Sequence, residues 1–366
     1  MFSIKKDELL SALTVTNSVI AEKSSTIPLL CNVLIRITDK TAYFTASDSV
    51  TSVVVRRKCE ESTNCVICIP ARELFDRVRK MPNGSIVSID DDGRIVCDKS
   101  NVKHKLPTLE PSIFPKIAFD KSKNPNPDVI VESELLDLLI SKIWFSVDND
   151  SSRPSTNNAY LFFNGETAKI IAFDGYRIIS MEKPTECRYS SVFIPYKSVM
   201  FIRKWLGKEK SGKISLYKEQ NGYCHMKLND TIYSFLTMNI DVPDFDKIFT
   251  INYTNYVVLK KEELIESIGS ANLSDDKIKF SFDKSNLKYM KCKILATDGA
   301  GKITEDILDC VIHGNVTEFK INSKFMLEPL VNFKSDFIRI EVGGSPSDPI
   351  MLVEEKYRII IAPMSL

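Results

Sequence analysis

The sequence predicts an α+β fold built from three tandem copies of one helix–sheet unit of about 122 residues. The first observation is a repeated pattern in which an apolar, strand-like run ends at an aspartate. Its copies are centred on Asp48, Asp174 and Asp298, which lie 126 and 124 residues apart. The pattern is clearest in residues 170–179, where an Asp-Gly pair separates two apolar runs and Gly supplies the positive φ of a tight turn. The recurrence indicates one such hairpin in each copy.

A second marker recurs with the same period. Pro70, Pro195 and Asn322 each close a strand-like run and open a helix-like run, at spacings of 125 and 127 residues. Pro and Asn both suit the entry of a helix. Two independent markers with one period indicate that the chain is a threefold repeat.

Each copy is expected to run in the order helix, hairpin strands, helix and further strands. The first helices are expected near residues 5–20, 135–143 and 264–268, and the second near 71–80, 196–206 and 323–334. Turn signals between the strands stand at residues 39–40, 164–165 and 221–222. Pro329 falls inside the last helix, which tolerates it only in the first turn or at a kink.

The length of 366 residues fits two or three domains, and the repeat selects three. We expect these domains at residues 1–122, 126–250 and 254–366. Residues 121–127 are polar and Pro-rich, which is typical of a linker between the first two.

Composition favours a soluble, cytoplasmic protein. No apolar run approaches the roughly 18 residues of a membrane helix, and residues 1–6 lack the apolar core of a signal peptide. Nine cysteines without framework spacing indicate reduced thiols. The C-x-x-C pair Cys65 and Cys68 lies in an apolar run far from any histidine, so we interpret it as buried structural thiols and not as a metal site.

The sequence contains no recognisable catalytic or cofactor motif. Gly-rich phosphate loops, H-E-x-x-H and G-x-S-x-G are all missing, and the three histidines are isolated. The acidic residues 90–93 fit a hairpin turn better than a calcium loop. The repeated aspartates are best explained as turn residues that accept backbone hydrogen bonds. We therefore expect no enzymatic activity, no cofactor and no metal.

Net charge is +1, so contact with nucleic acid requires positive charge gathered on one face. The second helices of the first two copies carry such an excess. The residues expected to face DNA are Arg72, Arg79, Lys80, Lys197, Arg203 and Lys204. A single basic helix is more often an ordinary solvated face, but equivalent positions in two copies favour a lining that contacts phosphates.

The whole chain resembles the family of bacterial DNA polymerase III β sliding clamps. Besides length and repeat, the matching stretches are residues 26–32, 174–177, 242–245 and 363–366. The resemblance implies three clamp domains and a homodimer that closes a six-domain ring around duplex DNA, with helices lining the hole and sheets outside. Such a ring is a processivity factor in DNA replication: a clamp loader places it on DNA, its DNA contacts are independent of sequence, and it tethers the replicative polymerase without catalysis of its own.

The resemblance also implies a pocket that receives a short peptide from partner proteins. Carried over by position, its residues are Phe173, Gly175, Tyr176, Arg177, Ile178, Pro243, Lys247, Ile248, Ile360, Ala362, Pro363, Met364, Ser365 and Leu366. Aliphatic walls with a few polar anchors suit such a site. Phe173, Ala362 and Ser365 differ from the residues more usual in the family, which leaves the preferred peptide open.

The dimer contact implied by the family joins the first domain of one subunit to the third domain of the other. By position it involves His104 and Leu106 on one side and Asn272 and Leu273 on the other. His104 and Asn272 replace more apolar residues, so we expect a weaker or more polar interface than usual.

Two other classes of function stay open on the residues alone. A repeat scaffold that binds proteins but not DNA would carry the same basic helices as solvated faces. An enzyme would need a site assembled between copies, which no cluster in the sequence indicates. A clamp stays on closed circular DNA in salt and slides off the ends of linear DNA, whereas a scaffold binds neither circular nor linear DNA.

Overall fold

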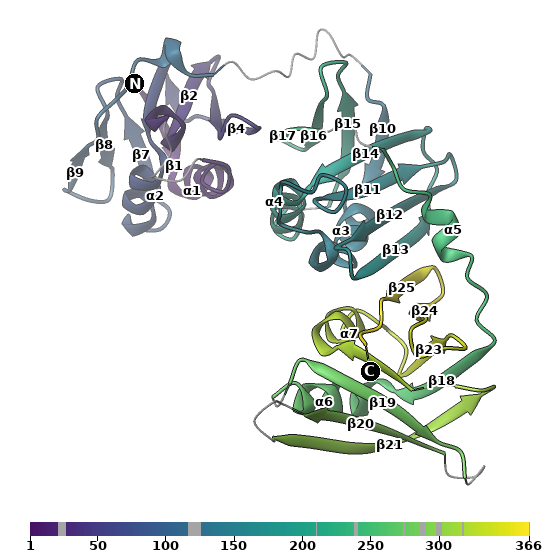
Figure 1. Cartoon of the computed structure of the whole chain (residues 1–366). Coiled ribbons are helices and arrows are strands. Elements are labelled where there is room, and N and C mark those ends of the chain that lie inside the picture. Colours follow the sequence, from purple (N-terminus) through teal and green to yellow (C-terminus); the bar gives the residue numbers. More distant parts are fainter. Residues whose placement is uncertain are drawn as a thin grey trace. The chain divides into compact units, whose positions relative to one another are not determined.

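The computed structural model describes residues 1–20, 27–115, 126–209, 211–237, 241–273, 275–285, 290–297, 302–316 and 318–365 (Figure 1). Its elements repeat one order three times: a strand, a helix, a set of hairpin strands, a second helix and three further strands. This order confirms the predicted α+β repeat.

The elements of the three copies are the following. The first copy holds β1 (Phe2–Lys5), α1 (Lys6–Thr16), β2 (Asn32–Thr38), β3 (Thr41–Ser47), β4 (Thr51–Lys58), β5 (Glu61–Ser62), β6 (Cys65–Pro70), α2 (Ala71–Lys80), β7 (Ile86–Ile89), β8 (Arg94–Cys97) and β9 (Lys103–Lys105). The second holds β10 (Val129–Glu132), α3 (Ser133–Ser141), β11 (Asn158–Phe163), β12 (Thr167–Phe173), β13 (Arg177–Pro184), β14 (Ser190–Pro195), α4 (Tyr196–Leu206), β15 (Lys213–Lys218), β16 (Tyr223–Leu228), β17 (Thr231–Leu236) and the short α5 (Phe245–Phe249). The third holds β18 (Asn255–Lys260), α6 (Lys261–Ala271), β19 (Lys277–Asp283), β20 (Lys291–Thr297), β21 (Ile303–His313), β22 (Phe319–Asn322), α7 (Ser323–Leu330), β23 (Phe337–Val342), β24 (Ile350–Glu354) and β25 (Tyr357–Ile361).

The chain forms two compact units, and the second copy contributes to both. One unit contains residues 1–136 and 200–238, and the other contains residues 137–199 and 239–366. The first unit holds a five-stranded sheet, β5-β1-β7-β8-β9, and an eight-stranded sheet, β10-β15-β16-β17-β4-β3-β2-β6. The second holds a twelve-stranded sheet, β14-β11-β12-β13-β25-β24-β23-β18-β21-β20-β19-β22. The second copy is divided because its strands form two half-sheets, β10-β15-β16-β17 and β14-β11-β12-β13. Each half-sheet is continued by a strand of a neighbouring copy.

Antiparallel pairing makes both of these junctions. β17 pairs with β4 from Thr231↔Val55 to Phe235↔Thr51, and β13 pairs with β25 from Arg177↔Ile361 to Met181↔Tyr357. Edge strands carry unpaired N–H and C=O groups that another strand can satisfy. Each junction therefore joins two copies through backbone hydrogen bonds as well as side-chain packing.

The helices pack by their apolar faces, as the sequence pattern predicted. α2 buries Ala71, Leu74 and Val78, which recur at helical spacing, while its charged residues stay outside. α7 is capped by Asn322, whose side chain accepts a hydrogen bond from the Lys324 N–H. Pro329 is the penultimate residue of that helix. The helix therefore ends four residues earlier than predicted, and Pro329 lies in its last turn and not in its first.

The repeated aspartates are turn residues where the structure describes them. Asp48 accepts hydrogen bonds through Oδ1 from the N–H groups of Val50 and Thr51, and Asp174 does the same for Tyr176 and Arg177. This confirms the interpretation of both as hairpin residues. Asp298 lies outside the described residues.

The cysteine pair of β6 is part of the sheet. Cys68 is buried, and burial raises the pKa of its thiol to about 11, which keeps it protonated and unreactive. Among the residues that the structure describes, no group of three or more His, Cys, Asp or Glu side chains is placed to hold a metal ion. In the same residues no helix is long and apolar enough to cross a membrane.

A row of buried polar side chains crosses the β4–β17 junction. Ser52 stands opposite Ser234, and Ser234 stands opposite His225 on β16. The His225 Nδ1 lies 2.7 Å from the Ser234 Oγ, and its Nε2 lies 3.2 Å from a carboxylate oxygen of Glu219. Burial lowers the pKa of His225 from its usual value, because the loss of hydration outweighs the attraction of Glu219. The junction thus contains a histidine that is held neutral.

This histidine predicts a pH-dependent stability. Because the folded pKa lies below the unfolded value of about 6.5, the unfolded chain binds the proton more readily, so stability falls as pH drops below that value. We expect the free energy of unfolding to decrease between about pH 7 and pH 5, and His225→Gln to remove part of that decrease. Denaturant titrations at each pH measure it, with His313→Gln, at an exposed site, as the control. A His225→Gln protein with the slope of the wild type would contradict this explanation.

Candidate functional site

The hairpin between β12 and β13 presents an exposed tyrosine. Asp174 fixes the turn through its two backbone hydrogen bonds, and Gly175 adopts a φ of +89°. No atom lies within 4 Å of the place that a Cβ on Gly175 would occupy, so the glycine is needed for its backbone conformation and not for space. Tyr176, the next residue, is 59% exposed. The turn therefore holds an aromatic ring at the surface.

The C-terminal tail runs beside this hairpin. Pairing of β13 with β25 places Ile178 opposite Ile360. Beyond β25, the Ala362 N–H donates to the Tyr176 carbonyl at 2.8 Å, and the Met364 N–H donates to the Lys320 carbonyl at 2.7 Å. Ala362 and Ser365 are exposed, whereas Pro363 and Met364 are half-buried. Leu366 lies outside the described residues.

An apolar cluster lies next to the hairpin and the tail. Its buried members are Tyr160, Ile171, Phe245, Phe249, Met351 and Ile360, and the half-buried residues packed on them are Phe162, Phe173, Ile178, Phe193, Ile248, Tyr253 and Val353. Residues that stand opposite one another in a sheet share a face. By this rule Phe193, Tyr160 and Ile171 share one face, as do Ile178, Ile360 and Met351. The structure thus brings together four of the predicted pocket residues: Phe173, Ile178, Ile248 and Ile360.

The segment around α5 provides another border. Pro243 is half-buried, and Ile248 packs on the apolar cluster. Lys247 is exposed and pairs with Asp244 at 3.0 Å, so it adds a charged edge. Phe173 packs edge-on against Phe245, with ring centroids 5.6 Å apart. The large side chain of Phe173 therefore fills space between the β12 strand and α5.

Phe325 on α7 belongs to this surface, although the sequence did not single it out. Its ring stacks on Tyr176 with centroids 5.3 Å apart and an interplanar angle of 19°. The helix entry at Asn322 could be predicted from its repeat position. Nothing in the sequence indicated that Phe325 meets a tyrosine about 150 residues earlier.

Arg177 has a different place from the rest of the predicted pocket. Its side chain is 2% exposed and makes ion pairs with Asp174 at 2.9 Å and Glu328 at 2.6 Å. It also donates to the Phe145 carbonyl, and its guanidinium lies over the rings of Phe145 and Phe325 at 5.1 and 4.9 Å. All these partners lie within the protein, so Arg177 holds Tyr176 and Phe325 in position from beneath.

Pro329 contributes to this arrangement. A proline has no N–H, so the carbonyl of the residue four positions earlier loses its helical partner. That residue is Phe325, and its carbonyl accepts a hydrogen bond from Arg177 at 3.4 Å. The proline in the last turn of α7 thus leaves an acceptor free for the buried arginine.

The residues predicted to face DNA are exposed on their helices. Arg72, Arg79 and Lys80 lie on α2, and Lys197, Arg203 and Lys204 lie on α4, all on the side away from the buried residues. Arg79 pairs with Asp76 at 3.5 Å and lies over the Phe75 ring. The first helices differ, since α1 and α6 each carry two acidic residues in their first turn.

The predicted dimer residues have unequal exposure. Leu273 is 84% exposed after the end of α6, and Asn272 accepts a hydrogen bond from the Ser323 hydroxyl. His104 is half-buried in β9. Leu106 is buried within its own copy, where its N–H donates to the Gly93 carbonyl at 3.0 Å, so its side chain is not at the surface of the chain.

Comparison with known proteins gives consistent relatives. The family model described as "DNA polymerase III beta subunit, N-terminal domain" matches residues 1–118. The beta sliding clamp of Proteus mirabilis is 24% identical over 345 residues, which cover 93% of this chain and 92% of that protein. The beta sliding clamp of Vibrio cholerae is 22% identical and covered along its full length.

Solved structures share the fold over the whole chain. The DNA polymerase III beta subunit of Thermotoga maritima matches with a TM-score of 0.89 at 19% identity, covering 100% of this chain and 99% of that one. The DnaN sliding clamp of Pseudomonas aeruginosa bound to griselimycin matches with a TM-score of 0.89 at 20% identity and the same coverage. The family model thus matches the N-terminal third of the chain, and the solved structures show that the whole chain shares the fold of the beta sliding clamps.

Proposed function

We propose that this chain is a DNA sliding clamp, a ring-forming processivity factor for DNA polymerase III. The observation that carries the proposal is the edge-to-edge pairing of successive copies. The half-sheet that ends in β17 is continued by β4, and the half-sheet that ends in β25 is continued by β13. The same kind of junction requires one more pairing, between β9 of the first copy and β21 of the third.

These two strands have free edges in the described chain. β9 pairs only with β8, and residues 303–309 of β21 pair only with β20 within the described residues. The three copies correspond to clamp domains at residues 1–122, 126–250 and 254–366. A second chain supplies the missing partner for each edge, so that two chains close head to tail into a ring of six domains.

Charge favours this pairing. The β9 edge carries Lys103 and Lys105, and the β21 edge carries Glu305, Asp306 and Asp309, all exposed. Opposite charges on facing edges set the orientation and register of an association. The exposed Ile303 and Leu273 add apolar area on the third copy. His104, Leu106 and Asn272 complete the proposed interface, with Leu106 acting by supporting the β9 hairpin from inside.

The proposed ring gives the basic helices α2 and α4 a binding role and not a catalytic one. Basic residues of α2 and α4 (Arg72, Arg79, Lys80, Lys197, Arg203 and Lys204) contact the phosphates of encircled duplex DNA without reading its sequence. Processivity then comes from topological linkage, so the chain needs neither catalysis nor a cofactor, and it acts in the cytoplasm with a replicative polymerase and a clamp loader.

The Tyr176 surface is the proposed docking site for partner peptides. Phe173, Ile178, Ile248 and Ile360 form its apolar floor, and Tyr176 stacked on Phe325 forms one wall. Gly175 and Arg177 position that wall. The remaining edge residues are Pro243, Lys247, Ala362, Pro363, Met364, Ser365 and Leu366. Exposed aromatic side chains on rigid supports are frequent hot spots of binding.

Charge reversal tests the ring. We expect Lys103→Glu with Lys105→Glu to give monomers, because both edges are then acidic, and Glu305→Lys with Asp306→Lys to give monomers for the converse reason. An equimolar mixture should restore the dimer, since each chain then offers the complement of the other at both junctions. Sedimentation velocity measures the three samples. A mixture that stays monomeric, or single variants that remain dimeric, would contradict the proposed edges.

Removal of the Tyr176 side chain tests the peptide site. Tyr176→Ala should weaken binding of a Gln-and-Leu-containing clamp-binding peptide about tenfold, because the stacked wall is worth roughly 1–2 kcal/mol. The control is Tyr189→Ala, at a tyrosine that is 82% exposed and lies outside the apolar cluster. Calorimetric titration gives both affinities. Equal effects of the two substitutions would mean that the peptide binds elsewhere.

A further inference from the structure

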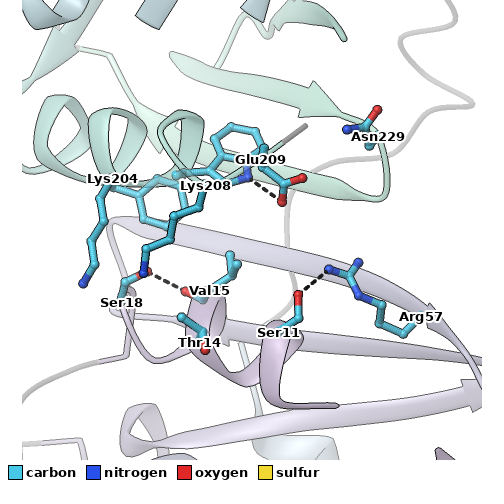
Figure 2. A pocket seen from close by; sticks show the side chains of 11 residues that line it. Ser11, Thr14, Val15, Ser18, Arg57, Lys204, Lys208, Glu209 and Asn229 are labelled. Carbon is cyan, nitrogen blue, oxygen red and sulfur yellow. Dashed lines mark hydrogen bonds between the residues drawn. The ribbon is translucent and has the colours of Figure 1, made fainter. Parts of the chain in front are cut away.

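The β4–β17 junction leaves a cavity of whose lining the clamp proposal uses only Lys204. Its volume is about 390 Å³. Figure 2 shows Ser11, Thr14, Val15 and Ser18 of the first copy on one side and Lys204, Lys208 and Glu209 of the second copy on the other. Pairing of Thr231 with Val55 sets the two sides next to each other. The cavity is therefore built by two copies and is fixed by the strand junction.

One wall of the cavity is aromatic and rigid. Phe201 and Trp205 of α4 line it, and Val15 adds an aliphatic contact. Phe201 stacks on Tyr233 with centroids 3.9 Å apart and also contacts Trp205 at 5.8 Å. The Trp205 indole N–H donates to Glu209 at 3.3 Å, the dashed line beside Glu209 in Figure 2. These contacts hold both rings in place, so a flat ligand meets a preformed apolar surface.

Two lysines stand at the rim with no acidic partner among the described residues. Lys204 and Lys208 are four residues apart, both are exposed, and neither makes an ion pair with a described residue. Arg57 differs, because Glu8 binds it at 3.0 Å and its guanidinium donates to the Ser11 hydroxyl. Glu209 is held by Trp205. The free positive charge of the cavity thus lies at the Lys204–Lys208 rim.

Polar groups around the opening supply both donors and acceptors. The hydroxyls of Thr14 and Ser18 donate to carbonyls of their own segment and keep their lone pairs free. Asn229, in the turn between β16 and β17, offers an amide with both a donor and an acceptor. An asparagine amide can match the edge of a nucleobase.

We propose that this cavity binds a single unstacked nucleotide, with its base against the Phe201–Trp205 wall and its phosphate between Lys204 and Lys208. The volume lies within the range of small-molecule sites, roughly 300–1,000 Å³. Packing of a base on an aromatic wall contributes about 1–3 kcal/mol and tolerates any base. A paired base cannot enter, so the ligand is a free nucleotide or a nucleotide of an unpaired strand. The inference goes beyond the clamp proposal, because it needs neither ring closure nor duplex DNA.

Fluorescence of Trp205 reports the binding directly. The chain has two tryptophans, so Trp144→Phe leaves Trp205 as the only indole. Thymidine 5′-monophosphate and a 5′-phosphorylated tetrathymidylate are titrated at fixed salt, with inorganic phosphate as the probe of charge alone. We expect both nucleotide ligands to quench Trp205 saturably and phosphate to have little effect. Equal affinity of the two nucleotide ligands identifies a free nucleotide as the source, and tighter binding of the tetramer identifies an unpaired strand.

Matched charge variants locate the site. Lys204→Gln with Lys208→Gln should weaken binding about tenfold, the effect of losing a charged hydrogen bond. Lys213→Gln with Lys227→Gln removes the same charge from β15 and β16, outside the cavity, and should change affinity less than about twofold. The proposal is overturned if nucleotides cause no saturable quenching, if phosphate alone is as effective, or if the two double variants weaken binding equally. An absence of saturable quenching, or an equal effect of phosphate alone, would not contradict the clamp proposal. That proposal is tested by charge reversal at β9 and β21, which does not depend on Trp205.

Discussion

Pairing of an edge strand with the edge of the next copy is the interaction on which the rest of this molecule depends. A copy of about 122 residues ends in strands whose backbone groups need partners, and the chain satisfies them by continuing each half-sheet into its neighbour. The β4–β17 pairing sets α1 beside α4 and so forms the cavity. The β13–β25 pairing sets the tail beside the Asp174 hairpin. The proposed ring extends the same rule to β9 and β21, which pair with the β21 and β9 of a second chain.

The buried Arg177 shows how one junction becomes a binding surface. A guanidinium removed from water is costly unless several groups satisfy it. Asp174, Glu328 and two carbonyls do so, and they come from three separate parts of the chain. The arginine therefore fixes the hairpin, α7 and the segment before β11 with respect to one another. Tyr176 and Phe325 are presented at the surface by that arrangement.

Much of the fold could be predicted because local chemistry repeats. The Asp174 turn, the Pro-led helix entry at Ala71 and the apolar spacing of α2 depend on neighbours in sequence, and each was found as expected. The Tyr176–Phe325 stack, the burial of Arg177 and of Leu106, and the cavity at Trp205 depend on contacts between distant segments. The periodic spacing of apolar residues in the sequence does not predict contacts between distant segments. The pocket residues were carried over by resemblance, and that route could not separate Tyr176, which is exposed, from its neighbour Arg177, which is not.

Topological linkage to DNA is the central claim, and retention on closed circles tests it most directly. The chain is placed by a clamp loader on circular DNA and passed through a sizing column in high salt, which screens ordinary phosphate contacts. The account predicts that the protein stays with the circle and is released when a restriction enzyme linearises it. Loss from the intact circle, or equal retention on linear DNA, would contradict the ring.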